Sequence, residues 1–387
     1  MKYKTGCYQT ITVITLYIIL AACKKSNDSA SIGYPPSFAQ IFDDYWHKMS
    51  QNYVYWNIDT TNWDAIYNSY KQAFDHLDVT NSRDVQQSVK LFREMTQGLT
   101  DGHYYIKFSN QALLDSIVYP AFDQKKNKAT YHNVFPYSSI TIKYLDPGYY
   151  EGSDTIGITE GEPLYALCGT IQNRCLYFYC NRFALLRAWS TSSSNKIKTL
   201  LSYFISSLHN MPTTIKKVII DLRGNRGGDI SDLNFLCGQF INSSMVIGYT
   251  RYKSNRNRLD YTPWIQASVT PQPGANPISG KIIVLTDNFT ASLAELVTFS
   301  IKTLPNGIII GENTWGANGP LTANYIYNDG SFDVSDFMHV ETASAQFKYI
   351  DGKMYEGIGI TPDITVPYNF VELNSGIDAG LEKALNE

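Results

Sequence analysis

Four short segments of this chain combine reactive side chains with glycines or turns that would expose them. The first is DLRGNRGG at residues 221–228, where three glycines follow a short apolar run. Glycine tolerates positive φ and has no side chain, so such a loop can turn its backbone amides toward a ligand. The spacing matches neither the Walker pattern nor the dinucleotide-binding pattern. A plain tight turn is the alternative interpretation.

The second segment is VLTDNFTASLAE at residues 284–295, with Ser292 near the start of an expected helix. A serine there would lie at the positive end of the helix, beside free amides that could hold a developing oxyanion. The same Ser-x-x-Glu pattern is also a capping box, which is the commoner role for it. From these residues alone the nucleophile and the helix cap both remain open.

The third and fourth segments contribute a carboxylate and a histidine. Residues 355–363 read YEGIGITPD, which is turn chemistry around Glu356, and a simple β-turn explains it equally well. Residues 101–103 read DGH, so that His103 follows a turn between an expected helix and an expected strand. Junctions of this kind often carry site residues, although a lone histidine is more often structural.

Apolar periodicity indicates the elements that must position these segments. From residue 175 onward, short buried strands alternate with helices, which predicts an α/β layered domain. The expected strands are residues 176–183, 217–222, 281–286 and 307–311, and the expected helices are 195–210, 232–240 and 292–303. Helical spacing before them predicts three helices, the first from residue 38 and the others at 63–77 and 82–98, followed by a strand at 104–108. The stretch 110–165 is polar, aromatic and irregular.

Taken together and in this order, the segments resemble the C-terminal processing, or tail-specific, serine peptidase family, whose fold the tricorn core and the interphotoreceptor retinoid-binding protein share. The similarity rests on four motifs and runs from about residue 38 to 370: DLRGNRGG at 221–228, TASLAE at 290–295, GENT at 311–314 and EGIGITPD at 356–363. It implies a crotonase-like (ClpP/crotonase) layered α/β core with an N-terminal helical subdomain. It implies no metal and no organic cofactor.

The resemblance also implies a mechanism. Ser292 would attack a peptide carbonyl and form an acyl-enzyme, and the backbone amides of Leu293 and of Gly227 or Gly228 would form the oxyanion hole. The substrate would be a peptide or an unfolded protein. No carboxylate-binding loop of a PDZ domain is recognisable in residues 110–165, so the cleft itself would select the peptide.

The proton acceptor separates two branches of the family. The processing-protease branch has a lysine where this chain has Ala317, which excludes a serine–lysine dyad. The tricorn-like branch uses serine, histidine and glutamate, and the matching positions here are His103 as base and Glu356 as the carboxylate that orients it. That branch has a serine before the histidine, whereas this chain has Gly102. Together with Arg226 in the glycine loop, these departures favour an alternative, namely a ligand-binding protein that has lost turnover.

The start of the chain predicts export. Lys2 and Lys4 precede an apolar run of about ten residues at 11–20, which suits a signal peptide because a membrane-spanning helix needs roughly 20. The run ends in Leu-Ala-Ala-Cys, which resembles the lipobox of bacterial lipoproteins, with Cys23 as the lipid anchor. We therefore expect a membrane-anchored lipoprotein of the periplasm or the bacterial cell surface. Its expected parts are a signal peptide (1–22), a tether (23–35), a helical subdomain (36–103), an irregular linking region (104–165) and the peptidase core (166–387).

Composition narrows the remaining choices. A formal net charge of −3 gives no basic surface for nucleic acid. The cysteines after the anchor match no zinc motif. Cys175 and Cys180 lie an odd number of residues apart on one expected strand and should face opposite sides, whereas a disulfide between Cys168 and Cys175 and a set of buried free thiols both remain open.

Overall fold

The computed structural model describes residues 36–155, 162–192, 194–254, 257–321 and 330–387. Cys23 and the expected signal peptide and tether lie outside these residues. Among the residues that the structure describes, no helix combines the length and the apolar character needed to cross a membrane.

A seven-stranded sheet forms the centre of the core. Its middle strands are parallel and almost wholly apolar, as expected for strands that are covered on both faces. The strand order is β14 (Ile364–Thr365), β10 (Gly307–Gly311), β9 (Lys281–Thr286), β6 (Lys217–Asp221), β5 (Cys175–Cys180), β4 (Leu164–Ile171) and β3 (Tyr150–Asp154), the last two being antiparallel to their neighbours. The predicted strands at 217–222, 281–286 and 307–311 are confirmed to within one residue.

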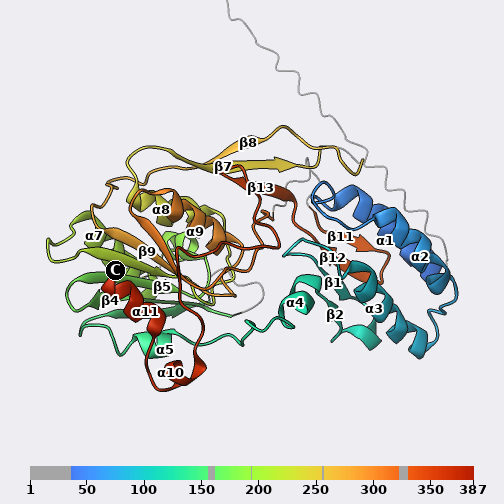
Figure 1. Ribbon diagram of the computed structural model, residues 1–387, viewed down its shortest axis with the longest axis horizontal. Coiled ribbons are helices and arrows are strands. Elements are labelled where there is room, and N and C mark those ends of the chain that lie inside the picture. The colour runs from blue at the N-terminus through green and yellow to red at the C-terminus, as the bar shows by residue number, and fades with distance from the viewer. Residues whose placement is uncertain (1–35, 156–161, 193, 255–256, 322–329) are drawn as a thin grey trace, which may run out of the picture. The chain divides into compact units, whose positions relative to one another are not determined.

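Helices pack on both faces of this sheet (Figure 1). One face carries α7 (Lys196–His209), α8 (Ser231–Cys237) and α9 (Leu293–Thr303), and the other carries α11 (Ala379–Asn386). Side chains alternate between the two layers along each strand: Val218 and Ile220 point into one layer and Ile219 into the other. The result is the mixed α/β fold predicted from the alternation of strands and helices.

The four cysteines of the core are buried free thiols. Cys168 belongs to one apolar layer and Cys175 to the other. The register explains this, because Cys175 pairs with Ile171, three residues from Cys168 and therefore on the opposite face of β4. A disulfide between Cys168 and Cys175, one of the two alternatives left open by the sequence, is thus excluded.

The front of the molecule packs three helices on a small sheet around a second apolar core. The helices are α1 (Phe38–Asn52), α2 (Trp63–Asp75) and α3 (Ser82–Thr96), capped by Ser37, Asn62 and Asn81. The sheet order is β11 (Phe332–Val334), β12 (Met338–Glu341), β1 (Tyr105–Phe108) and β2 (Ile117–Val118). In Figure 1 the orange strands β11 and β12 lie beside the blue helices, so residues distant in sequence complete the front body.

The segment 104–165, expected to be irregular, contains several short elements. Besides β1, β2 and β3 it forms η1 (Gln111–Leu113), α4 (Pro120–Lys125) and α5 (Ser138–Thr141). Elements of two to six residues are too short to show a period in the sequence, and they depend on long-range partners. The strand predicted at 104–108 is confirmed as β1, whereas the expectation of an irregular segment from residue 110 onward was wrong for η1, β2, α4, α5 and β3.

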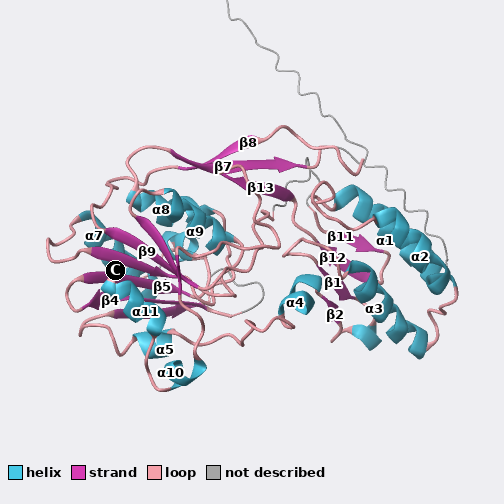
Figure 2. Ribbon diagram, in the orientation of Figure 1, coloured by secondary structure: helices cyan, strands magenta, loops and turns pink. Residues whose placement is uncertain are grey.

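A third sheet pairs β7 (Met245–Tyr252) with β8 (Ile265–Val269) and with β13 (Ala345–Tyr349), as Figure 2 shows in magenta. The remaining helical elements are short: α6 (Leu185–Ser190), η2 (Gly238–Phe240) and α10 (Phe370–Asn374).

Candidate active site

Ser292 lies in a tight turn between β9 and α9. Hydrogen bonds of the preceding residues hold this turn: the Phe289 amide donates to Asp287 Oδ1 (2.9 Å), and the Thr290 hydroxyl donates to Leu222 O (2.9 Å). Ser292 itself has φ +57° and ψ −125°. Such a conformation costs a residue with a side chain about 1–3 kcal/mol and persists only where the surroundings impose it. A strained serine at the start of a helix is consistent with a functional position.

The carboxylate of Glu295 does more than cap this helix. Its Oε2 accepts the Ser292 amide (3.3 Å) and the Ala317 amide (2.7 Å), and its Oε1 accepts the Thr314 hydroxyl (2.5 Å) and the Gly316 amide (2.8 Å). The capping box expected from Ser-x-x-Glu therefore also joins the serine turn to the loop at 314–317. The nucleophile position and the helix cap are compatible here, because the cap uses the Ser292 amide as a donor and does not use the hydroxyl hydrogen.

The glycine loop packs directly on the serine. A Cβ on Gly227 would lie 2.7 Å from Ser292 Cβ, and a Cβ on Gly228 would lie 2.0 Å from Phe183 O, so both positions require glycine. Their φ values, +95° and +146°, also disfavour a side chain. Asn225 holds the loop in place: its carbonyl accepts the Ala291 amide (3.0 Å) and its Oδ1 accepts the Gly227 amide (2.8 Å).

Two backbone amides, each one residue after Gly227 or Ser292, make no hydrogen bond with any residue that the structure describes. They belong to Gly228 and Leu293, the latter at the first position of α9. The first amides of a helix have no partner within the helix and carry its positive end. The Leu293 amide is therefore available to an anion at the start of α9, next to Ser292 in the chain.

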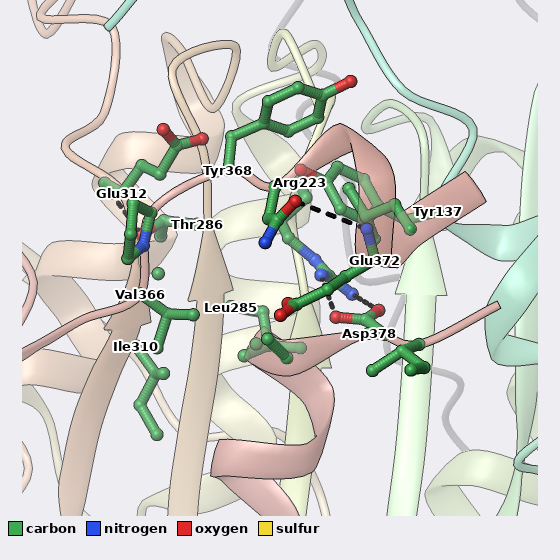
Figure 3. Close-up of a pocket in the computed structure, with 17 residues that line it drawn as sticks. Tyr137, Arg223, Leu285, Thr286, Ile310, Glu312, Val366, Tyr368, Glu372 and Asp378 are labelled. Atoms are coloured by element: carbon green, nitrogen blue, oxygen red, sulfur yellow. Dashed lines mark hydrogen bonds and ion pairs between the residues drawn. The ribbon is translucent and has the colours of Figure 1, made fainter. Parts of the chain in front are cut away.

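Arg223, in the same loop, has a structural environment. Its guanidinium lies between Asp221 (2.6 Å) and Asp378 (2.8 Å) and stacks 3.8 Å from the centroid of the Tyr137 ring. The two carboxylates raise the pKa of Arg223, although its burial alone would lower it. Figure 3 shows the small pocket of about 30 Å³ beside it, whose lining includes neither Ser292 nor His103. We assign this buried ion pair to support of the glycine loop.

His103 enters the site from the turn before β1. Its two ring nitrogens are buried and have no hydrogen-bond partner among the described residues, so no hydrogen bond joins it to Ser292. Burial lowers the pKa of His103 to about 4, which makes the ring neutral at pH 7. Both side chains nevertheless line one cavity. A neutral imidazole without a partner can accept a proton.

Glu356 makes no hydrogen bond to the His103 ring. Its Oε1 accepts the Gly102 amide (2.7 Å), while its Oε2 accepts the Tyr55 hydroxyl (2.9 Å) and the amides of Asn318 (2.7 Å) and Gly319 (2.9 Å). These four donors occupy the carboxylate. It therefore acts on the backbone next to the histidine.

Asp101 completes a buried cluster with His103 and Glu356. One nitrogen or oxygen atom of each side chain lies within 4.8 Å of the others, which is a geometry that could hold a metal ion. Asp101 accepts the His103 amide (2.8 Å) and the Ala343 amide (2.7 Å), so both carboxylates already serve as backbone acceptors. Burial raises the pKa of both carboxyls, and the charge of Asp101 raises the pKa of Glu356 further. We assign no metal to the cluster.

The cavity beside Ser292 has a volume of about 370 Å³. Ala317, at the position of the family lysine, forms part of its wall. Aromatic rings form much of the rest, and the sequence alone gave no indication that these residues meet. The described lining is Gly102, His103, Ile117, Tyr119, Phe122, Arg226, Phe289, Ala291, Ser292, Trp315 and Ala317.

Lys125, at the end of α4, was also missed. Its Nζ donates to Trp315 O and lies 4.7 Å from the centroid of the Trp315 ring. Burial lowers its pKa to about 8. It supports the wall formed by Trp315 without lining the cavity. Its sequence signal, a lysine in an aromatic-rich stretch without periodicity, is weak.

Fold and site together match those of a serine-type peptidase family. Residues 182–366, just under half of this chain, match the model of peptidase family S41. The chain is 27% identical to the tricorn protease of Thermoplasma volcanium over 166 residues, which cover 42% of this chain and 14% of that protein. It is 24% identical to the nisin-resistance protein of Lactococcus lactis over 181 residues, covering 45% and 53%. The chain thus spans at most about half the length of these relatives.

Two solved structures share the fold. A candidate peptidase from Parabacteroides merdae superposes with a TM-score of 0.67 at 19% identity, covering 91% of this chain and 96% of the other. Mature CPAF complexed with lactacystin gives a TM-score of 0.58 at 11% identity, covering 90% and 97%. The similarity to these structures concerns the mixed α/β fold alone.

Proposed function

We propose that this chain is a lipid-anchored serine endopeptidase that hydrolyses peptide bonds through an acyl-enzyme on Ser292. One observation carries the proposal: Ser292 lines the same cavity as the neutral His103, whose ring nitrogens have no hydrogen-bond partner among the described residues. A crotonase-like core would present the serine at the strand-to-helix turn. The substrate would be a peptide or an unfolded protein segment.

In the proposed reaction, His103 accepts the proton of the Ser292 hydroxyl while the oxygen attacks the peptide carbonyl. The resulting oxyanion is held by two amides, and the imidazolium then donates its proton to the leaving amine. Water, activated by the same histidine, hydrolyses the ester. The carboxylates of Asp101 and Glu356, close to the ring, would stabilise the imidazolium once it forms.

Of the two glycines that the sequence offered for the oxyanion hole, the hydrogen bonds support Gly228. The Gly227 amide already donates to Asn225 Oδ1 (2.8 Å), whereas the amides of Gly228 and Leu293 have no partner among the described residues. An oxyanion hole needs donors that are free before the reaction begins. Gly227 would serve by allowing the loop to approach Ser292.

A fluorophosphonate probe tests the serine. We expect it to label the full-length chain in detergent at neutral pH, and we expect Ser292→Ala to abolish labelling. Ser202→Ala is the matched control, because that side chain is exposed on α7 and bonds only within its own helix. Equal labelling of the Ser292→Ala variant would show that another residue reacts.

The anchor is proposed from Cys23 and the apolar run before it, which place the protein on a membrane facing the periplasm or the exterior. Incorporation of labelled palmitate in a bacterial host tests this. We expect Cys23→Ala to remove the label and Cys7→Ala, which alters the expected signal peptide only, to retain it. Label in the Cys23→Ala variant would rule out this anchor.

A second function has support from one observation. No hydrogen bond joins His103 to Ser292, and Ala317 replaces the family lysine, as expected for a binding protein on the same fold. Such a protein would bind a peptide in the cavity without turnover. Peptide binding by a chain that resists the fluorophosphonate probe would establish this function.

A further inference from the structure

Part of the wall of the cavity beside Ser292 is apolar because two of its aromatic residues direct their polar atoms at the backbone. The Tyr119 hydroxyl donates to Gly102 O (2.9 Å), and the Trp315 indole nitrogen is directed at the same oxygen (3.3 Å). The rings of Tyr119, Phe122, Phe289 and Trp315 remain to line the space. A cavity of about 370 Å³ lies within the range of small-ligand pockets. It can hold one large side chain of a peptide.

Arg226 is the one side chain with a formal charge at pH 7 among the described residues of this lining. Its guanidinium carbon lies 6.0 Å from the centroid of the Phe289 ring. The side chain is exposed and makes no ion pair with any described residue. Its positive charge acts on Tyr119 across the cavity, where it lowers the pKa of that phenol against the larger effect of burial.

Hydrogen bonds hold the backbone on both sides of Arg226 in place. On one side, Asn225 O accepts the Ala291 amide, and on the other the Gly227 amide donates to Asn225 Oδ1. Arg226 therefore projects from a rigid loop that also carries the free amide of Gly228. A planar guanidinium with five donors suits a carboxylate, which it can bind through two parallel hydrogen bonds.

We propose that the cavity binds a large apolar side chain of a peptide and that Arg226 selects a carboxylate close to it on the same peptide. The inference rests on the proposed function in one respect, since it takes the cavity beside Ser292 as the peptide site. The carboxylate can come from an acidic side chain or from the C-terminus of the peptide. A basic side chain at that position is repelled.

Binding to the full-length Ser292→Ala chain tests this selection without requiring turnover. Isothermal titration calorimetry would compare three short peptides that share one central Phe. Two are amidated at the C-terminus, and one of them has Glu beside the Phe while the other has Gln. The third has Gln beside the Phe and a free C-terminal carboxylate at the following residue. We expect a carboxylate peptide to bind about tenfold more tightly than the Gln peptide, as for a charge-assisted hydrogen bond. Tighter binding of the Glu peptide identifies a side-chain carboxylate, and tighter binding of the free-terminus peptide identifies a terminal one. Equal affinity of all three overturns the proposal.

Variants assign the selection to Arg226. In the Ser292→Ala background, Arg226→Met should bring the ratio of affinities for carboxylate and Gln peptides close to one, and Arg226→Glu should favour a Lys peptide. Arg83→Met is the matched control, because Arg83 is exposed on α3 and does not line the cavity. An unchanged ratio in Arg226→Met, or the same loss of preference in Arg83→Met, contradicts the role of Arg226.

A second set of measurements tests whether the cavity binds the large apolar side chain of the peptide. Phe122→Ala should reduce the preference for a central Phe over a central Ala, because it removes one ring from the cavity wall. A preference that stays the same shows that the side chain binds elsewhere. These results are separable from the proposed function: if the wild-type chain resists the fluorophosphonate probe while the Arg226-dependent preference persists, hydrolysis fails and the binding site stands.

Discussion

Gly102 and Ala317 pack so closely that a Cβ on Gly102 would lie 2.7 Å from Ala317 Cβ and 2.6 Å from Gly316 O. These two residues are also the positions at which the chain departs from the two branches of the family that it resembles. The two departures are linked structurally, because the loop at 316–317 occupies the space that a side chain at residue 102 would need. Glu356 then bonds the bare amide of Gly102 (2.7 Å).

The first prediction concerns Gly102→Ser, which would restore the residue type of the tricorn-like branch. Because a Cβ there overlaps backbone atoms, the loop at 316–317 must shift, and we expect a loss of about 1–3 kcal/mol of unfolding free energy, as for overpacked sites. The probe should also label Ser292 more slowly, since His103 follows directly. Thermal melting and labelling rates measure both effects. A variant that melts and labels like the wild type would contradict the packing described above.

A second prediction concerns Ala317→Lys, which would restore the lysine of the processing proteases. Ala317 is buried against Gly102, and its amide is held by Glu295 (2.7 Å). An ammonium introduced there would lose hydration, which favours its neutral form. The longer side chain would also strain the packing against Gly102. We expect lower stability and no faster labelling of Ser292. Labelling faster than in the wild type would mean that the site accepts a lysine base after all.

Glu356→Gln provides a third test. An amide at this position can keep one acceptor oxygen but must turn its NH₂ group toward backbone or hydroxyl donors. Leaving buried donors unsatisfied costs about 1–3 kcal/mol. We expect this loss of stability together with labelling slowed by at least about tenfold, because misplacement of a catalytic group has effects of that order. Glu162→Gln, at an exposed position, should change neither quantity.

The fourth prediction is a pH profile. Burial lowers the pKa of His103 to about 4, and only the neutral ring can accept the serine proton. Protonation of the ring itself should therefore slow labelling only near pH 4, whereas in an ordinary histidine it would do so near pH 6.5. Labelling rates after brief exposure to each pH measure this. A midpoint near 6.5 would show that His103 is solvated or is not the base.

The same shift affects stability. Between about pH 4 and 6.5 the unfolded chain binds a proton at His103 that the folded chain does not. The contribution of His103 to the free energy of unfolding is thus fully present above about pH 6.5 and is lost as the pH falls toward 4. Denaturant unfolding of the wild type and of His103→Phe should show a steeper acid loss in the wild type. Parallel curves would contradict the lowered pKa.

The sequence predicted the central strands well because their signal is local. β6, β9 and β10 are short apolar runs covered on both faces, and each ends at a polar or glycine turn. The position of Ser292 followed from the same feature, since a strand that ends at Thr286 and a helix that begins at Leu293 leave little room for the turn.

The cavity could not be predicted in the same way. Tyr119, Phe122 and Lys125 come from a segment without periodicity, and they meet Phe289 and Trp315 only through long-range contacts. The partners of Glu356 were equally hidden, because Tyr55 lies 301 residues before it. The choice between Gly227 and Gly228 depended on one hydrogen bond to Asn225, which composition does not encode.

The pairing of β1 with β12 has a consequence for the order in which the molecule is made. Tyr105 pairs with Glu341, and the amide before His103 is bonded by Glu356, so the histidine loop obtains its support from residues that leave the ribosome more than 200 positions later. Synthesis proceeds from the N-terminus, and the earlier part of the chain must wait for these partners. A chain that has been made only as far as residue 300 therefore contains both His103 and Ser292 but no assembled site. The site can therefore form only after residue 356 has been synthesised.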